Sequence, residues 1–508
     1  MLLQLPAIFG DDMVLQRDMR VPVWGAAPAG ETVTVDIDGL TLSVEAGADG
    51  TWRLDLPPAP AGGPYTLGVR CGTERWAAER VWRGEVWLAG GQSNMELPLK
   101  NSQDGPAAVA ASGEPRLHFY MPAKVTTQEE AEKLEAGSQR PCWRLSAPES
   151  AGELSAVAYY AARTLLDYLP DIHVGVIACP WGGTYAHCWM PRDVLASFPE
   201  GRRRIGEYDA RIGGKSDEEF AREQTAYQRE VDEWNRCAEE CRAREPGIAQ
   251  KAINDECGLY PWPPPAGRTA YQRPGNLWQS ILCRVRPYAV RGFWYYQGEQ
   301  DETWPEDYYA LLTRLIGQWR SDWEDARKPF LLCQLPMFQS KLPAEGVDAM
   351  AWPVLREAQA RAARDVPGVE MAVLADCGEF DNVHPLDKRT PGTRLGLLSL
   401  EAVYGIPVTG RAPVCVRACR KDGGAVLRFE WTGGGLTFSG GGFQLAGADG
   451  VFHDARARVT APDTVEVFAA GVPAPETVRY AWYGFGPAGL HGGTGLAAAP
   501  LERKLEKE

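Results

Sequence analysis

The chain has 508 residues, 44% hydrophobic and 24% charged, which is the composition of an ordinary folded protein. This length exceeds what one simple core organises, so we expect two to four domains. The formal net charge of −14 argues against nucleic acid and anionic membranes as partners, because both repel an acidic protein.

Residues 1–80 show the pattern of short β-strands. Apolar and polar residues alternate in PVWGAAPAGETVTVDIDG and DGTWRLDLPPAPAGGPYTLGVR, and Gly, Pro and Asp interrupt them. This pattern predicts a β-sandwich-like N-terminal domain over residues 1–80. The first residues lack a basic start, a long apolar stretch and a small-residue cleavage site, so we expect a cytoplasmic protein. No apolar run has the length of a membrane span.

The stretch EVWLAGGQSNMELP, residues 85–98, predicts a buried strand at residues 86–89 that enters a glycine-rich turn. Ser93 follows this turn, where a strand ends and another element begins. A serine in such a turn can present its hydroxyl as a nucleophile, as in the α/β hydrolases. Capping of a helix by Ser93 and Asn94 is the simpler alternative, so the turn alone does not establish chemistry.

From about residue 81 to residue 407, strand-like and helical patterns alternate. The expected strands are residues 173–179, 290–296, 330–335 and 369–375, and the expected helices are residues 155–169, 307–323, 352–365 and 393–404. This alternation predicts an α/β catalytic domain with a parallel sheet covered by helices on both faces.

A charged segment at about residues 200–275 interrupts this alternation. We interpret it as a helical insertion whose charges face solvent rather than form a site. Residues 408–508 return to short strands with glycine-rich turns, which predicts a second β-rich region. We expect the two β-rich ends of the chain to pack against each other.

The 12 cysteines are widely scattered. Cys237 and Cys241 are four residues apart, as are Cys415 and Cys419, but no histidine cluster accompanies either pair. We therefore expect no metal site, and free buried thiols of the kind found in a reducing compartment.

Four polar loops should meet at one edge of the sheet, because each follows an expected strand. Ligands of open parallel sheets bind beyond the carboxyl ends of the strands. The loops contain Ser93, Gly182 and Gly183, Gln297 to Glu299, and Asp381 to His384.

His384 is the candidate base for a nucleophilic Ser93. Its neutral imidazole can take the serine proton and later protonate the leaving alcohol. Asp381 precedes it by three residues and can fold back to orient the ring, with Asp376 as the alternative carboxylate. An ordinary turn stabilised by the aspartate side chain is the simpler interpretation of this spacing.

The candidate oxyanion donors are backbone and side-chain amides on these loops. The N–H of Ser93, an N–H of Gly182 or Gly183, and the side-chain amide of Gln297 could converge on one point. Glu299 is expected to hold its loop in place rather than to act as an acid.

The motifs GGQSNME, WGGT at residues 181–184, RPYAVRGFWYYQGEQD and DNVHP at residues 381–385 resemble the sequence blocks of the SGNH hydrolases. Together with residues 9–33, they resemble in particular the bacterial sialate O-acetylesterase family. The resemblance implies an SGNH-type domain and a serine esterase that removes acetyl groups from sugars. It assigns the nucleophile to Ser93 and the base to His384, with Gln92, Asn94 and Glu299 in supporting positions.

Two departures accompany the resemblance. The asparagine of the family's third block has no match, and Gln297 occupies that stretch. Many relatives place the aspartate two residues before the histidine, where this chain has Asn382.

We therefore expect an enzyme that hydrolyses acetyl esters on an O-acetylated sugar or oligosaccharide through an acyl-serine intermediate, without a cofactor. An esterase for acetylated xylan or another plant polysaccharide is one alternative. A non-catalytic carbohydrate-binding protein is another.

Overall fold

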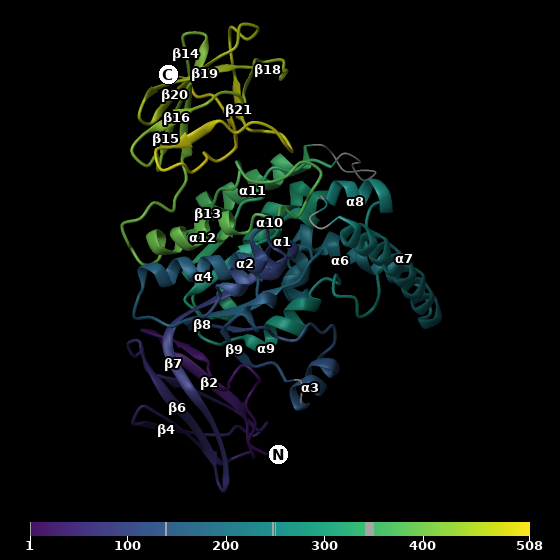
Figure 1. Cartoon of the computed structure of the whole chain (residues 1–508), viewed down its shortest axis with the longest axis vertical. Helices are drawn as coiled ribbons and strands as arrows, with labels where there is room; N and C mark the ends of the chain where they lie inside the picture. Colours follow the sequence, from purple (N-terminus) through teal and green to yellow (C-terminus); the bar gives the residue numbers. More distant parts are fainter. Residues whose placement is uncertain (1, 138–139, 246–247, 249, 341–349, 508) are drawn as a thin grey trace.

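The computed structural model describes residues 2–137, 140–245, 248, 250–340 and 350–507. Its central body is an α/β domain built on a mostly parallel sheet, with β-strands from both ends of the chain attached to it (Figure 1). The sheet order is β13–β12–β11–β7–β10–β8–β9, and only β8 and β9 are antiparallel neighbours. The strands in that order are Val369–Ala372, Phe330–Cys333, Gly292–Tyr296, Glu74–Gly91, Val174–Pro180, Glu114–Tyr120 and Trp143–Ser146.

Strand β7 joins the N-terminal strands to the central sheet. Its first part pairs with β6 (Gly62–Cys71), and residues 82–84 pair with β1 (Val14–Gln16). Its last part, residues 85–91, lies between β10 and β11. The expected strand at residues 86–89 is therefore only the end of a strand of 18 residues, which continues through the expected boundary between residues 80 and 81.

Helices cover both faces of the sheet, as the βα alternation predicted. Trp87 stacks on Trp294 and donates a hydrogen bond to Tyr404, which follows α12. Gly90, on the opposite face of β7, lies under Trp319 of α10. Each expected helix of the central domain is present within four residues of its expected ends. The observed helices are α4 (Ala156–Tyr168), α10 (Tyr308–Asp322), α11 (Ala351–Asp365) and α12 (Arg389–Ala402).

The remaining elements lie mainly at the ends of the chain and in the insertion. The N-terminal strands are β2 (Val21–Ala26), β3 (Thr32–Ile37), β4 (Leu40–Glu45) and β5 (Thr51–Leu56). The insertion holds α6 (Pro199–Ile212), α7 (Asp217–Arg244) and α8 (Gln250–Cys257). Short helices are α1 (Ser93–Glu96), α2 (Gly105–Ala110), α3 (Gln128–Ala136), α5 (Arg192–Ala196) and α9 (Cys283–Val285).

The C-terminal region is formed by ten strands in the described residues. They are β14 (Val414–Lys421), β15 (Gly424–Glu430), β16 (Leu436–Phe438), β17 (Phe443–Ala446), β18 (Phe452–Asp454), β19 (Arg456–Ala461), β20 (Thr464–Phe468), β21 (Thr477–Tyr480), β22 (Leu490–Gly492) and β23 (Leu501–Lys504). That each end of the chain forms a β-sandwich domain with the expected boundaries stays a prediction.

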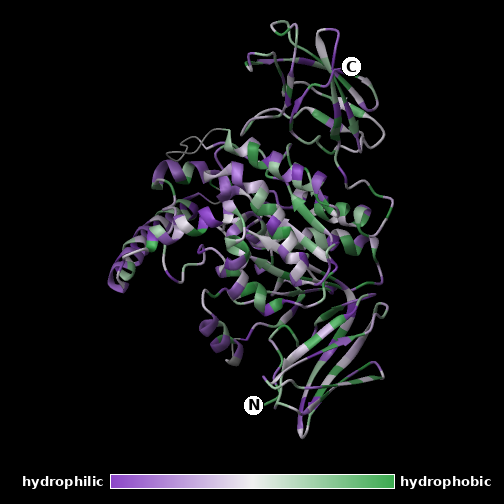
Figure 2. Cartoon of the chain, turned by 180° about the vertical axis from the view of Figure 1, so that it is seen from behind, coloured by the Kyte–Doolittle hydropathy of each residue, from purple (hydrophilic) through white to green (hydrophobic). Residues whose placement is uncertain are grey.

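The two β-rich ends do not pack against each other, so that expectation is wrong. They lie at opposite ends of the molecule, separated by the α/β body (Figures 1 and 2). The physical reason is the topology: β7 enters the sheet from one side, and the chain leaves α12 toward the other. Helix α7 projects from the body with a largely hydrophilic surface (Figure 2). Within the described residues, no helix combines the length and the apolar character that a membrane crossing requires.

A buried carboxylate joins the N-terminal strands, the sheet and the end of α12. Glu85 of β7 accepts hydrogen bonds from Arg17 at 2.6 Å, Arg291 at 2.8 Å and Tyr404 at 3.0 Å. Gln16 donates a further hydrogen bond to it at 3.1 Å. Burial would raise the pKa of Glu85, but the hydrogen bonds from Arg291, Gln16 and Arg17 outweigh it and hold this pKa below its ordinary value.

Glu85→Gln should lower the free energy of unfolding at pH 7 by about 3 kcal/mol, because two guanidinium groups lose their partner. The pKa of Glu85 is lower in the folded state than in the unfolded state. Its carboxylate therefore contributes its full stabilisation of the fold above about pH 5, and this contribution is lost as the pH falls through the folded-state pKa. Urea unfolding at several pH values measures both effects. Glu79→Gln, whose side chain is 71% exposed, is the control. Equal unfolding midpoints for wild type and Glu85→Gln at pH 7 would contradict the assignment.

Candidate active site

The end of β7 is a turn that only small residues can form. A Cβ atom on Gly91 would lie 2.1 Å from the carbonyl oxygen of Tyr296 in β11, and one on Gly90 would lie 2.6 Å from the Trp319 ring. Gly91 also has a φ of 133°, which favours glycine. The two glycines let β7 end tightly between its neighbours, and Ser93 then begins α1 with its side chain at the mouth of a cleft.

Ser93 and His384 are brought together across 291 positions of sequence. The Nε2 atom of His384 lies 2.8 Å from the Ser93 hydroxyl oxygen. His384 belongs to the loop that follows β13, and its backbone N–H donates to the Asn382 side chain at 3.0 Å. Asn382 in turn donates to Glu379 at 2.8 Å. The histidine is thus positioned by a loop that is hydrogen-bonded within itself.

Two effects at His384 favour its neutral imidazole, although the side chain is exposed at the mouth of the cleft. Desolvation by the walls of the cleft, followed by the positive charge of Lys388, lowers the pKa of His384 to about 4. A neutral ring with Nε2 at hydrogen-bond distance from a serine hydroxyl is arranged to accept the serine proton. The pair has the geometry of a nucleophile and its general base.

Among the described residues, no hydrogen bond joins a candidate carboxylate to the His384 ring. Asp376 forms a two-pronged ion pair with Arg394, with both N–O distances 2.6 Å, so its oxygens are already used. Asp381 lies in the wall of the cleft with a φ of 61°, but none of the hydrogen bonds between described residues joins its side chain to His384. The orienting role of Asp381 stays a prediction, and Asn382 is the residue seen to hold the histidine backbone.

The residues on either side of Ser93 fasten the turn to the neighbouring loop. The Gln92 side-chain oxygen accepts from the backbone N–H groups of Gly298 and Gln300 at 3.4 and 3.2 Å. Asn94 donates to Glu299 at 2.5 Å and accepts from Lys388 at 2.6 Å. These contacts join the turn after β7 to the loop after β11, and the supporting roles of Gln92, Asn94 and Glu299 stay a prediction.

Gln297 does not face the cleft, and the expectation that it donates to an oxyanion is wrong. It is fully buried, and its side-chain nitrogen donates to Asp301 at 2.6 Å, to the Thr184 carbonyl at 3.0 Å and to Gln92 at 3.2 Å. Its N–H groups are therefore used inside the protein. Gln297 connects the loops after β10 and β11 instead of binding substrate.

The predicted donor role of Gly182 is also wrong in this structure, whereas Gly183 remains a candidate. The N–H of Gly182 donates to the carboxylate of Glu96, which also pairs with Lys124. Within the described residues, the N–H groups of Ser93 and Gly183 donate to no protein acceptor. These two backbone groups are thus the donors that remain for an oxyanion.

A cleft of about 960 Å³ extends from Ser93 and His384 between three parts of the chain. The insertion contributes one wall through uncharged side chains, and the expectation that its charges face solvent stays a prediction. Trp262 packs against the loop after β10 so closely that a Cβ atom on Gly183 would lie 2.0 Å from its ring. The lining residues from the insertion are Trp234, Gln250, Asn254, Leu259, Tyr260 and Trp262.

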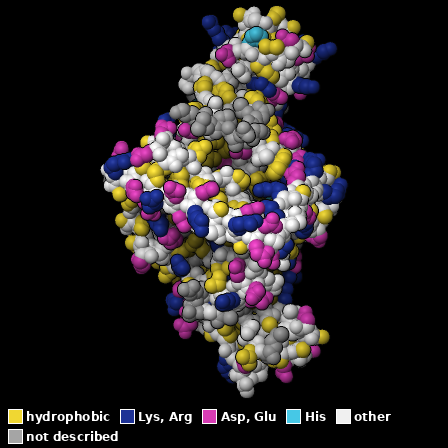
Figure 3. All heavy atoms as spheres, turned by 90° about the vertical axis from the view of Figure 1, so that its right-hand side faces the viewer, with side chains coloured by type: hydrophobic (Ala, Val, Ile, Leu, Met, Phe, Trp, Pro, Cys, Tyr) yellow, Lys and Arg dark blue, Asp and Glu magenta, His cyan; other side chains and the backbone are white. Residues whose placement is uncertain are grey.

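The lining of the cleft is aromatic and acidic. Trp262 and Phe380 are 44% and 48% exposed, although both are large and apolar. The described lining residues include Glu299, Glu302 and Asp381 but no lysine or arginine. Burial, with the nearby charge of Glu299, raises the pKa of Glu302 to about 7. Acidic and basic side chains are intermixed on the face of the molecule that carries the insertion (Figure 3).

Two cysteines of the insertion form a disulfide, so the expectation of free thiols is wrong for them. Cys237 of α7 is bonded to Cys257 of α8, and their Cα atoms are 5.8 Å apart. Cys241 lies beside them, and the three sulfur atoms are within 4.8 Å of one another. They form the one group in the described residues with the spacing of a metal site. In the disulfide form, Cys237 and Cys257 offer no thiolate to a metal.

Three features of the site escaped the sequence analysis. Lys388 follows the DNVHP motif by three residues, and only its burial against Asn94 makes it part of the site. Glu96 lies within the recognised block, yet its contact with Gly182 depends on the fold. The aromatic residues near Trp262 were a usable signal, because they interrupt an otherwise charged insertion.

Comparisons with known proteins agree with this geometry. No family model matches the chain. The chain is 30% identical to a carbohydrate acetylesterase from Xanthomonas citri of known crystal structure, with a TM-score of 0.77 and 99% of each chain covered. It is 26% identical to the sialate O-acetylesterase of Mus musculus, covering 77% of this chain and 72% of the relative. The corresponding human enzyme is 25% identical, with 78% and 70% covered. The chain therefore belongs to the sialate O-acetylesterase-like family of carbohydrate acetylesterases.

Proposed function

We propose that this protein hydrolyses acetyl esters of carbohydrates and that Ser93 is its nucleophile. The observation that carries the proposal is the 2.8 Å contact between the Ser93 hydroxyl and Nε2 of His384 at the mouth of the cleft. Because the chain belongs to a family of acetylesterases, the bond to be cleaved is taken to be an acetyl ester.

In the first half of the reaction, Ser93 Oγ attacks the acetyl carbonyl carbon while His384 accepts the hydroxyl proton. The tetrahedral intermediate then expels the sugar alcohol, which receives that proton from His384. In the second half, His384 takes a proton from water, and the resulting hydroxide attacks the acetyl-serine. Acetate leaves, and Ser93 regains its proton. The backbone N–H groups of Ser93 and Gly183 are the proposed donors to the negative oxygen.

Ser93→Ala and His384→Ala should each lower turnover of an acetyl ester by about three decades, because neither residue activates the ester without the other. Release of acetate measures the rate, and circular dichroism verifies folding. Ser102→Ala is the matched control, since Ser102 is buried outside the cleft. A folded Ser93→Ala preparation with wild-type turnover would refute the assignment.

The pH dependence of kcat/KM tests the state of His384. Only the neutral ring accepts a proton, and its pKa is lowered to about 4, so kcat/KM should stay level from about pH 8 to pH 5 and fall below that. Lys388→Met should move the acidic limb to higher pH, because the cation that opposes protonation of His384 is removed. Lys100→Met, whose side chain is 49% exposed, should leave the limb in place.

The same profile tests the carboxylate that sequence reasoning proposed. Asp381→Asn should reduce turnover less than His384→Ala does, because the loop already holds the histidine through Asn382. The opposite result would be an acidic limb near pH 7 in the wild type that moves to lower pH in Asp381→Asn. In that case Asp381 raises the pKa of His384 and orients its ring, and the proposed arrangement needs revision.

The charge of the cleft favours a neutral acetylated sugar over a sialic acid. Recognition of a sugar carboxylate calls for a cation, usually arginine. The described lining residues offer none and present Glu299 and Glu302 instead. The exposed rings of Trp262 and Phe380 can cover the apolar faces of neutral sugar rings. We therefore propose a neutral O-acetylated oligosaccharide, such as acetylated xylan fragments, as the substrate class.

The substrate class is tested by comparing kcat/KM for acetylated xylo-oligosaccharides and for O-acetylated sialic acid, each relative to p-nitrophenyl acetate. The neutral ester should be preferred by at least about tenfold, which corresponds to about 1.4 kcal/mol. At pH 8, where most Glu302 carboxyls are ionised despite their raised pKa of about 7, Glu302→Gln should reduce the preference for the neutral ester, because a negative charge leaves the cleft. Glu306→Gln, on the exposed surface, should not change this preference. A preference for the sialic acid ester in the wild type would overturn this proposal but not the esterase chemistry.

A further inference from the structure

Helices α7 and α8 form a hairpin with a small core of its own. Ala238 and Cys241 of α7 and Ile253 of α8 are buried together, separate from the main hydrophobic core. The disulfide between Cys237 and Cys257 ties the two helices at this point. The hairpin is thus held by few apolar contacts, by the ion pair between Arg244 and Glu256 and by one covalent bond.

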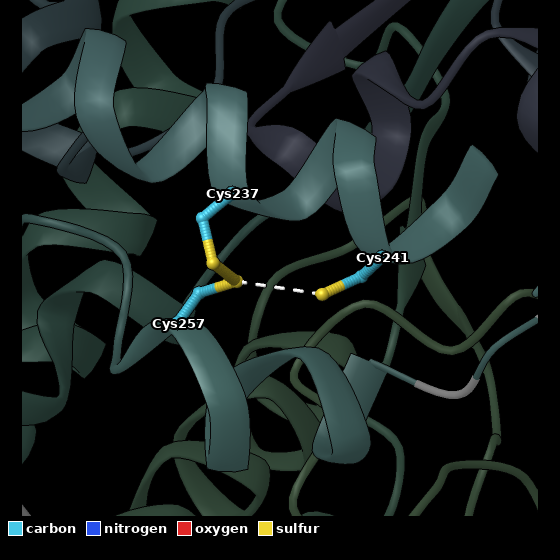
Figure 4. Close-up of side chains that lie close together, drawn as sticks. All are labelled: Cys237, Cys241 and Cys257. Carbon is cyan, nitrogen blue, oxygen red and sulfur yellow. Dashed lines mark hydrogen bonds between the residues drawn. A yellow bond between two sulfur atoms is a disulfide. The ribbon is translucent and has the colours of Figure 1, made fainter. Parts of the chain in front are cut away.

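A third cysteine lies within reach of this bond. The Cys241 sulfur is 3.7 Å from the Cys257 sulfur, and only 1% of this residue is exposed. In the view of Figure 4 it lies on the side of the Cys257 sulfur away from Cys237. Arg244 donates to the Cys241 sulfur at 3.7 Å. Because Cys237 and Cys241 are one helical turn apart, both face Cys257 from the same side of α7.

We propose that Cys237, Cys241 and Cys257 form a thiol–disulfide exchange site that sets the position of the cleft wall. The Cys241 thiolate attacks the Cys257 sulfur, a bond forms between them, and the bond between Cys257 and Cys237 breaks. The electron pair leaves with Cys237, which takes up the proton that Cys241 lost. One disulfide and one thiol are present before and after, so the exchange needs no oxidant.

The geometry permits this exchange with a small movement. A disulfide has an S–S distance of about 2.05 Å, so the two sulfurs at 3.7 Å must approach by less than about 2 Å. The new bond would attach Cys257 one turn further along α7, a shift of about 6 Å in the point of attachment. Because α8 and the residues after it are held by this bond, they would move with the Cys257 sulfur, by less than about 2 Å.

The segment that would move reaches the active site. Gln250 and Asn254 of α8 line the cleft, and so does Trp262, five residues after Cys257. The indole N–H of Trp234 donates to the Gly258 carbonyl at 2.8 Å, which couples this segment to α7. Trp262 in turn lies against Gly183. Exchange should therefore alter binding of the sugar more than it alters Ser93 and His384, which are held by the loops of the central sheet.

Disulfide mapping tests the exchange and is independent of the proposed enzyme activity. Cys237→Ser is equilibrated in a glutathione redox buffer, its free thiols are alkylated, and its peptides are analysed by mass spectrometry after cleavage at glutamate, which separates positions 237 and 241. The expected product links Cys241 to Cys257. Alkylation of both thiols in a protein that is folded by circular dichroism would overturn the proposal. Wild-type protein mapped in the same buffer should contain both linkages, and Cys142→Ser, which removes an exposed free thiol, should match it.

The effect on the cleft is measured by comparing the two locked forms, Cys241→Ser and Cys237→Ser. The KM for acetylated xylo-oligosaccharides should differ by at least about threefold between them, while turnover of p-nitrophenyl acetate should agree within about twofold. Equal KM values in two forms with different mapped disulfides would refute the link to the cleft. Loss of all esterase activity from the wild type would instead refute the proposed function and leave the mapping result valid.

Discussion

The site depends on one continuous strand, β7. Its last residues are enclosed by neighbouring strands on both edges and by packed side chains on both faces. Strand β7 begins among the N-terminal strands and ends between β10 and β11, directly before Ser93. No side chain fits at Gly91, because the Tyr296 carbonyl of β11 occupies that space. The buried Glu85 fixes the same strand near its middle through Arg17 and Arg291. A rigid strand of this kind places the nucleophile with little freedom, which is what preorganised catalysis requires.

The polar interior behind the nucleophile uses neutral amides to connect the loops. Gln92, Asn94 and Gln297 hold the turn after β7 to the loops after β10 and β11. An amide side chain can donate and accept at once, so it can bridge backbone groups and the buried carboxylates of Asp301 and Glu299. This explains why Gln297, which occupies a position resembling a catalytic block, acts here as a connector.

The cleft is assembled from parts of the chain that belong to different regions. The α/β body supplies Ser93 and His384, the insertion supplies Trp262, and Gly484 comes from the connection between β21 and β22. The residues proposed for the chemistry thus follow strands of the sheet, while the proposed sugar-binding walls are carried by segments attached to it. A wall built on the α7–α8 hairpin can change without disturbing the hydrogen bond between Ser93 and His384, because no sheet strand lies in the hairpin.

The sequence by itself determined the alternation of strands and helices, the edge of the sheet at which the loops meet, and the pairing of Ser93 with His384. Hydrophobic periodicity and turn chemistry are local properties, and parallel strands bring their carboxyl ends to one edge whatever the details. Only the tertiary structure decided that Gln297 points inward, that Glu96 takes the N–H of Gly182, that Cys237 bonds to Cys257 and that Trp262 reaches the site. Each of these contacts joins residues from different loops or helices, and its geometry depends on how those elements pack, which no local pattern encodes.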